Sequence, residues 1–295
     1  MGIENRLICP KLLYIISCIK LRMLSYLLPL VAGALIVALF VAQPYWLEYK
    51  RNEARRLPFK KHWRKIIQQR MPYFKTMPAH LQLQLKQHIQ VFLLEKRFVG
   101  YNGITISDEI KVTIAAQACL LLLNRKTHYY PKLKTILVYP RAFVKQQQSA
   151  NADGVHFTQK IALAGESWSF GKIVLSWQDT LSGAYDPNDG HNVVIHEFAH
   201  QLDQENGVAN GAPILRKEQN YDVWASVLSA QFEHLKRQAS TGEASIFDYY
   251  GTTNPAEFFA VASEVFFEKS KAFKQQHPKL YWQLSVYYGV DPTDW

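Results

Sequence analysis

Two patterns of hydrophobic residues divide the chain. Between Met23 and Leu47 no residue is charged, and apolar residues are densest over Leu24–Ala42. As an α-helix, these 19 residues extend about 28 Å, close to the roughly 30 Å hydrocarbon core of a bilayer. A buried core helix or a cleavable signal peptide is the alternative interpretation. The run has no polar stripe and exceeds the usual signal-peptide core, so the pattern predicts a transmembrane anchor over 24–47, after an N-terminal segment 1–23.

Beyond the anchor, apolar residues recur at helical spacing or alternate as in strands. Helices are predicted at His62–Lys75, Ala79–Arg97 and about 108–123, and later at about 192–206, 220–238, 255–269 and 278–288. Strands are predicted between these two groups, at Thr135–Tyr139, His156–Leu163 and Lys172–Trp177. This order indicates the α+β class and one compact domain over 62–295, preceded by a basic juxtamembrane linker over 48–61.

The charge of the chain is concentrated around the predicted anchor. The formal net charge is +10, but residues 1–75 contain 14 of the 34 Lys and Arg and only three of the 24 Asp and Glu. The rest of the chain is nearly neutral, so the basicity indicates a lipid bilayer as partner through 24–47 and no nucleic acid. More basic residues follow the anchor than precede it, which favours a cytoplasmic body. Reversed, periplasmic topology and a true start at Met23 remain open.

The strongest chemical signal is the sequence His196-Glu197-Phe198-Ala199-His200. Helical spacing brings His196 and His200, four residues apart, to the same side of a helix, where both imidazoles can bind one Zn²⁺. Glu197 lies about 100° round the helix and is expected to act as general base on a water molecule whose pKa the zinc lowers. The alternative interpretation is an inert surface helix.

A catalytic zinc site needs a third protein ligand. Asn254 followed by Pro255 is a strong helix start, and this helix carries Glu257 and, seven residues later, Glu264. Two carboxylates on one face of so apolar a helix are costly unless a cation compensates them. We expect Glu257 to be a ligand and Glu264 to contact a ligating histidine; in the alternative, one of them is exposed or paired with a lysine.

Two further features allow two interpretations each. Asp203 lies seven residues after His196, so it could orient a ligand or be solvated at the helix end. Lys172–Trp177 could be an edge strand that pairs with an extended peptide, or an ordinary core strand.

Residues 62–293 resemble the Mlc titration factor A family of zinc peptidases. The matching segments are Val-Ile-His-Glu-Phe-Ala-His-Gln-Leu-Asp (194–203), Ile-Val-Leu-Ser-Trp (173–177), Ile-Leu-Val-Tyr-Pro (136–140) and Tyr-Gly-Thr-Thr-Asn-Pro-Ala-Glu-Phe-Phe-Ala-Val-Ala-Ser-Glu (250–264). The resemblance implies a zincin fold related to the catalytic domain of anthrax lethal factor. It also implies that Glu257 is the third ligand and that Tyr250 stabilises the oxyanion.

The resemblance further implies aminopeptidase activity on short substrates and binding of a sugar-uptake repressor, a transcriptional-regulator partner. The chain departs from the soluble members of that family by its N-terminal anchor. The sequence therefore predicts a membrane-anchored peptidase with one Zn²⁺ per chain that acts on peptides or proteins. Both exopeptidase and endopeptidase activity are compatible with it. The alternative is a regulatory protein that titrates a transcription factor and keeps the zinc site for structure.

Overall fold

The computed structural model describes residues 10–141, 143–150, 156–163, 165–168, 171–186 and 188–295. It is a mostly helical α+β structure with a small mixed sheet. The chain divides into two compact units, residues 1–53 and 54–295, and each is described by itself.

The first long helix, α1 (Pro10–Arg56), contains the uncharged run. Within it, Ser25–Arg56 is long and apolar enough to cross a membrane, and it is the one such stretch among the described residues. Two prolines, Pro29 and Pro44, lie inside α1, and transmembrane helices tolerate proline more often than soluble ones do. The apolar N-terminal helix expected from the sequence is therefore present.

Four helical segments form the first part of the body. They are α2 (Lys61–Arg70), the short 3₁₀ helix η1 (Pro72–Lys75), α3 (Ala79–Glu95) and α4 (Asp108–Leu120). The prediction of one helix over 62–75 was wrong in one respect, because the α-helix ends before Pro72, which lacks a backbone N–H and restricts the residue before it. The Ser107 hydroxyl caps α4 by accepting a hydrogen bond from Ile110 N.

A four-stranded sheet has the order β1-β2-β6-β5. Its strands are β1 (Arg97–Gly100), β2 (Thr135–Tyr139), β6 (Lys172–Ser176) and β5 (Gly165–Trp168). The first three are parallel, and β5 pairs antiparallel with β6. A separate antiparallel hairpin joins β3 (Phe143–Ala150) to β4 (His156–Leu163). The edge-strand interpretation of Lys172–Trp177 was wrong: β6 is an interior strand whose apolar residues are buried, and the edge strands are β1 and β5.

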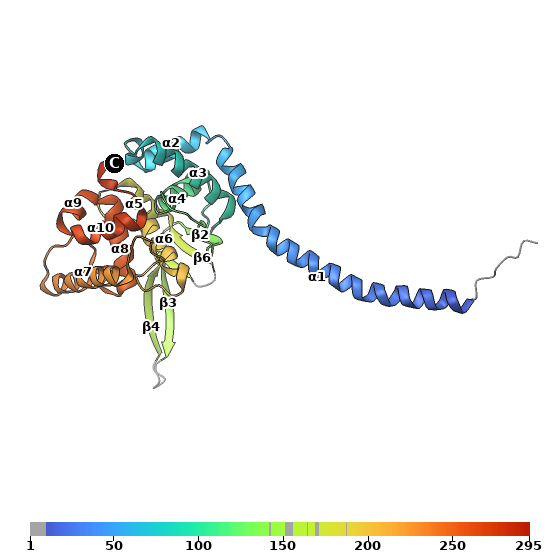
Figure 1. Cartoon of the computed structure of the whole chain (residues 1–295). Helices are drawn as coiled ribbons and strands as arrows, with labels where there is room; N and C mark the ends of the chain where they lie inside the picture. Colours follow the sequence, from blue (N-terminus) through green and yellow to red (C-terminus); the bar gives the residue numbers. More distant parts are fainter. Residues whose placement is uncertain (1–9, 142, 151–155, 164, 169–170, 187) are drawn as a thin grey trace, which may run out of the picture. The chain divides into compact units, whose positions relative to one another are not determined.

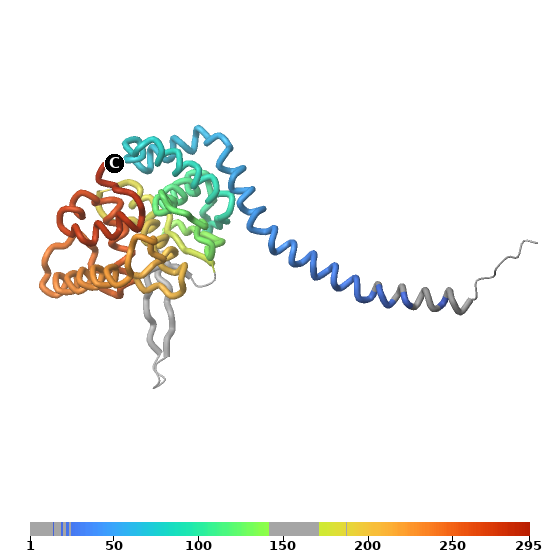
Figure 2. The backbone as a smooth tube through the Cα atoms, in the orientation of Figure 1, coloured from blue at the N-terminus to red at the C-terminus, as the bar shows by residue number. Residues whose placement is uncertain are grey.

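The second half of the body is helical. It contains α5 (Trp177–Tyr185), α6 (Val193–Asp203), α7 (Tyr221–Thr241), α8 (Pro255–Glu268), α9 (Ser270–Gln276) and α10 (Pro278–Tyr288), with 3₁₀ turns η2 (Gln204–Asn206), η3 (Tyr249–Thr252) and η4 (Pro292–Asp294). Figure 1 shows α6 at the centre of the body, where it packs against α4, α8 and β5. In Figure 2, α7–α10, orange to red, are grouped on one side of the body.

The hydrophobic core surrounds α6 and α8. Fully buried apolar side chains come from both helices, from α3 and α4, and from the two central strands of the sheet: Leu85, Ile89, Phe92, Ile114, Ile136, Val138, Ile173, Leu175, Val194, Ile195, Phe198, Phe259, Val265 and Phe266. Because each of these side chains contributes roughly 1.5–3 kcal/mol when fully buried, the two helices are held firmly against each other. Their polar faces meet at one end of this contact.

Candidate metal centre

Helix α6 begins with an asparagine cap that fixes the position of the histidine motif. The Asn192 Oδ1 atom accepts hydrogen bonds from Val194 N at 3.2 Å and Ile195 N at 3.1 Å. These are backbone donors that a helix start otherwise leaves unpaired. One face of the helix buries Phe198 and its apolar neighbours. His196 and His200 therefore lie one turn apart on the other side.

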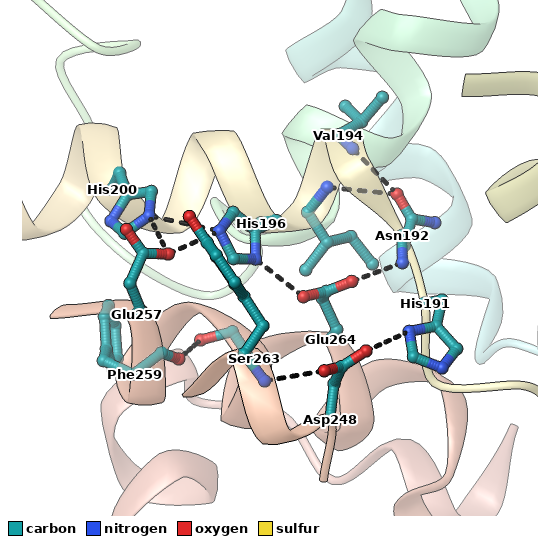
Figure 3. A network of polar contacts seen from close by, with 12 residues as sticks. His191, Asn192, Val194, His196, His200, Asp248, Glu257, Phe259, Ser263 and Glu264 are labelled. Atoms are coloured by element: carbon teal, nitrogen blue, oxygen red, sulfur yellow. Dashed lines mark hydrogen bonds and ion pairs between the residues drawn. The ribbon is translucent and has the colours of Figure 1, made fainter. Parts of the chain in front are cut away.

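Helix α8 begins in the same way and brings in a carboxylate. The Asn254 Oδ1 atom accepts from Ala256 N at 2.9 Å and Glu257 N at 3.0 Å. Glu257 lies in the first turn of α8, and its side chain points towards the two histidines of α6 (Figure 3). Two separate helix starts thus position the three residues that the sequence suggests as ligands.

The ligand atoms of these three residues converge. His196 Nε2 lies 2.9 Å from Glu257 Oε2, His200 Nε2 lies 3.2 Å from the same oxygen, and the two Nε2 atoms are 3.2 Å apart. Neighbouring ligands of a tetrahedral Zn²⁺, bonded at about 2.0–2.1 Å, lie about 3.3 Å apart. The triangle is close to one face of such a tetrahedron, so the two nitrogens and one oxygen fit a zinc ion.

Glu264 orients the first histidine. Its Oε1 atom lies 2.8 Å from His196 Nδ1, and its Oε2 atom accepts from Asn192 N at 2.5 Å (Figure 3). An ionised carboxylate only accepts, so His196 carries a proton on Nδ1 and directs Nε2 towards the ligand triangle. This is the contact with a candidate ligand histidine that the sequence suggests for Glu264.

The electrostatics of the cluster favour a positive charge at its centre. Burial lowers the pKa of His196, but the hydrogen bonds with Glu257 and Glu264 outweigh burial and raise it to about 10. Burial raises the pKa of Glu257, whereas its hydrogen bonds with His196 and His200 lower it to about 2. Two carboxylates, Glu257 and Glu264, therefore contact the two imidazoles, and a divalent cation would balance their charge.

Glu197 is buried beside the cluster, with 4% of its surface exposed. Its Oε2 atom makes no hydrogen bond with any residue that the structure describes. Burial raises the pKa of Glu197, the two histidines lower it, and the nearby glutamates raise it again, to about 7. A carboxylate with a pKa near neutrality can accept a proton and return it, as a general base must.

Tyr250 lies on the exposed side of the cluster. Asp248 caps η3 by accepting from Tyr250 N at 2.7 Å, and the Tyr250 ring centroid lies 5.9 Å from that of His196. Burial raises the pKa of Tyr250, as do the charges of Glu257 and Glu197. The phenol therefore stays protonated at neutral pH and can donate a hydrogen bond near the ligands.

Comparison with known proteins agrees with this geometry. A family model described as "Glucose-regulated metallo-peptidase M90" matches residues 46–289. The chain belongs to this family. The resemblance to the Mlc titration factor A family is confirmed as well, since proteins of that name are among its relatives.

Three relatives of this chain each match most of its length. "Uncharacterized protein slr2042" of Synechocystis sp. is 38% identical over 258 residues, which is 87% of this chain and 94% of the relative. Mlc titration factor A of Escherichia fergusonii is 32% identical over 225 residues, 75% of this chain and 84% of its own. The protein of that name from Salmonella arizonae is 32% identical over 228 residues, 76% and 89% of the two chains.

A metallopeptidase family implies a metal ion. In the described part of this M90 chain, His196, His200 and Glu257 form the group whose ligand atoms could hold one, all within 4.8 Å of one another. His191, outside this group, is exposed and lies 3.6 Å from the carboxylate of Asp248.

The structure contradicts one of the two interpretations of Asp203, that of a solvated residue at the helix end. It is not solvated at the helix end but fully buried, and its Oδ2 atom accepts from Gly211 N at 2.7 Å. Gly211 has φ +78°, and a Cβ there would lie 2.6 Å from Pro255 O. Asp203 therefore holds the loop after α6 against the start of α8, the helix of Glu257.

Two polar residues near the M90 site did not stand out from the sequence. Asn192 was included in the helix but not recognised as its cap, although an asparagine before an apolar run is a usual N-cap signal. Glu268 lies one turn after Glu264 on the same apolar helix and accepts from Asn192 Nδ2 at 2.8 Å. The four-residue spacing of two acids on a buried helix was the available signal.

Proposed function

We propose that the protein is a membrane-anchored, zinc-dependent peptidase with a zincin-like catalytic domain over 62–295. The observation that carries this proposal is the convergence of His196, His200 and Glu257 next to the buried, unpaired oxygen of Glu197. Three protein ligands of this kind are typical of catalytic rather than structural zinc sites. Membership of the M90 family supports the metallopeptidase assignment.

In this proposal, one Zn²⁺ is held by His196, His200 and Glu257. When bound, it supplies Lewis acidity that activates water and polarises the peptide carbonyl. Glu197 accepts a proton at its Oε2 atom and later returns it to the leaving amine. The Tyr250 hydroxyl donates a hydrogen bond to the negative charge that develops on the carbonyl oxygen.

We assign residues 24–47 to a membrane anchor and 48–61 to a basic linker, with the catalytic domain in the cytoplasm. The apolar stretch inside α1 supports the anchor. The excess of basic residues that follows it supports the orientation. The anchor would keep the enzyme close to substrates at the membrane surface.

A second candidate function comes from the names of the relatives. Proteins called Mlc titration factor A match three quarters of the chain, which supports a regulatory protein that binds a transcriptional regulator. In that case the zinc site would be largely structural. The two candidate functions differ in whether Glu197 is needed for catalysis as well as for folding.

The deciding experiment compares wild type with Glu197→Gln as full-length protein in detergent. We expect about one zinc per chain in both and a loss of peptide cleavage by about 10²–10⁴-fold in the variant, because a general base contributes that much. Glu233→Gln is the matched control, since this glutamate is exposed on α7 and pairs with Lys236. If the wild type binds zinc but cleaves no member of a peptide library, the proposed enzymatic function is wrong and the regulatory function remains.

A further inference from the structure

Asn192 connects three helices at the edge of the candidate metal site. Its side-chain oxygen caps α6, and its Nδ2 atom donates to Glu268 Oε1 on α8 at 2.8 Å and to Gly183 O on α5 at 3.3 Å. Its backbone N–H donates to Glu264 Oε2, next to His196 (Figure 3). One residue thus uses its donors and its acceptor to join the helix of both histidine ligands to the helix of Glu257.

Close packing fixes the position of Asn192. It is 2% exposed, and a Cβ on Gly183 would lie 3.0 Å from Asn192 Cα and 2.9 Å from His191 O. Gly190, with φ +77°, lies against the aliphatic part of Lys269, where a Cβ would be 3.2 Å from Cδ. The loop before α6 is therefore pressed between α5 and the end of α8, so Asn192 cannot shift without disturbing both.

Glu268 accepts a hydrogen bond from Asn192, as Glu264 does. Glu268 is buried, and its burial raises its pKa to about 9; the hydrogen bond from Asn192 lowers it, and the charges of Glu264 and Asp189 raise it. Tyr73, also close, is a phenol whose pKa is raised by burial and by Glu268. At neutral pH Glu268 is therefore a neutral acid that accepts a hydrogen bond without repelling Glu264.

We propose that Asn192 and Glu268 are positioning residues that hold Glu264, and through it the His196 imidazole, in the metal-binding orientation. This inference rests on the zinc site of the proposed function. Both oxygens of Glu264 are used, one on His196 and one on Asn192 N, so the direction of the imidazole depends on where Asn192 lies. Glu268 and Gly183 fix that position through the side-chain amide.

The first test removes the amide but keeps the cap. Asn192→Ser retains a side-chain acceptor for the first turn of α6 and the backbone N–H for Glu264, but it loses the donor to Glu268. Partners beyond the metal ligands are worth about 10–100-fold in metal affinity, so we expect zinc to bind about tenfold more weakly, measured on the full-length protein by competition with a chelator. Asn220→Ser is the matched control, because Asn220 caps α7 in the same way and α7 supplies no residue to the site.

The second test separates hydrogen bonding from charge at Glu268. Glu268→Gln keeps a neutral acceptor for Asn192, whereas Glu268→Ala removes it. We expect the alanine variant to bind zinc about tenfold more weakly and the glutamine variant to remain within about twofold of wild type. Thermal unfolding in the presence of chelator compares the stability of the two variants without zinc. If the two are equally stable, a purely structural role of Glu268 would not explain why only the glutamine variant keeps its zinc affinity.

Several results would overturn the inference. One is a zinc affinity of Asn192→Ser within twofold of wild type. Another is an equal loss of zinc affinity in Asn192→Ser and Asn220→Ser, or in the two Glu268 variants. Each would leave the proposed function intact. A wild-type protein that binds no zinc would overturn the proposed function as well.

Discussion

The ring of Tyr250 lies 5.9 Å from the ring of His196, centroid to centroid, whereas the neighbouring Tyr249 donates its hydroxyl to the Glu243 carbonyl oxygen. Only one of two adjacent phenols is therefore available to the site. We expect Tyr250→Phe to lower kcat by about 100-fold with little change in KM, since loss of one oxyanion donor costs about 10²–10³-fold. Steady-state kinetics on a cleaved peptide measure this. Tyr249→Phe should change kcat less than threefold, and equal effects of the two substitutions would contradict the assignment.

Glu257 is the proposed ligand that comes from a different helix than the two histidines. Glu257→Ala leaves two imidazoles, and we expect at least about a 100-fold loss of zinc affinity, because three protein ligands are needed for a stable catalytic site. Metal analysis after dialysis against a weak chelator measures it. Glu233→Ala, at an exposed position on α7, should retain zinc. Full zinc occupancy in Glu257→Ala would show that another residue is the third ligand.

His88 on α3 makes folding stability depend on pH. Its Nδ1 atom lies 2.9 Å from the Tyr129 hydroxyl, and burial, followed by the charge of Arg55, lowers the pKa of His88 from 6.5 to about 4. Between pH 6.5 and pH 4, His88 is protonated in the unfolded chain but not in the folded chain. The free energy of unfolding is therefore highest above pH 6.5 and decreases as the pH falls towards 4. From pH 7 to pH 5 the loss is about 2 kcal/mol.

The His88→Gln variant tests this dependence. The substitution removes the titrating group, so thermal unfolding in detergent should change less between pH 7 and pH 5 than it does for wild type. The comparison is between the two pH dependences, which allows for a lower stability of the variant at both. An identical pH dependence in both proteins would assign the effect to other groups.

The orientation of the proposed anchor can be measured directly. A reporter joined after Trp295 through a flexible linker reports the compartment of the catalytic domain. The excess of basic residues after the anchor predicts activity of a reporter that works only in the cytoplasm. A reporter active only in the periplasm would reverse the topology while leaving the zinc chemistry unaffected.

The sequence predicted the parts of the site that depend on local spacing. His196 and His200 lie together because four residues make about one helical turn, and Asn254 with Pro255 correctly marked the start of α8. That Glu257 meets these histidines depends on how α6 packs against α8, which local patterns do not contain. Its identification from the sequence relied mainly on the family resemblance.

The missed elements are short or have few local signals. Strand β5 is four residues long and begins with a glycine, and α5 contains Gly183 and precedes a segment rich in Asp and Gly, so neither has a clear local pattern. The buried state of Asp203 was missed because its partner, Gly211 N, lies in an irregular loop. Such contacts are set by tertiary packing, which overrides local preference.

The paired asparagine caps have a consequence for motion in the site. Glu257 and His196 lie within four residues of the starts of α8 and α6, in turns that usually fray and exchange their amide hydrogens rapidly. Asn254 and Asn192 occupy the amides through which that fraying would begin. Damage to either cap should therefore first be seen as local opening around the ligands, on a time scale seen by hydrogen exchange, while the rest of the body stays folded.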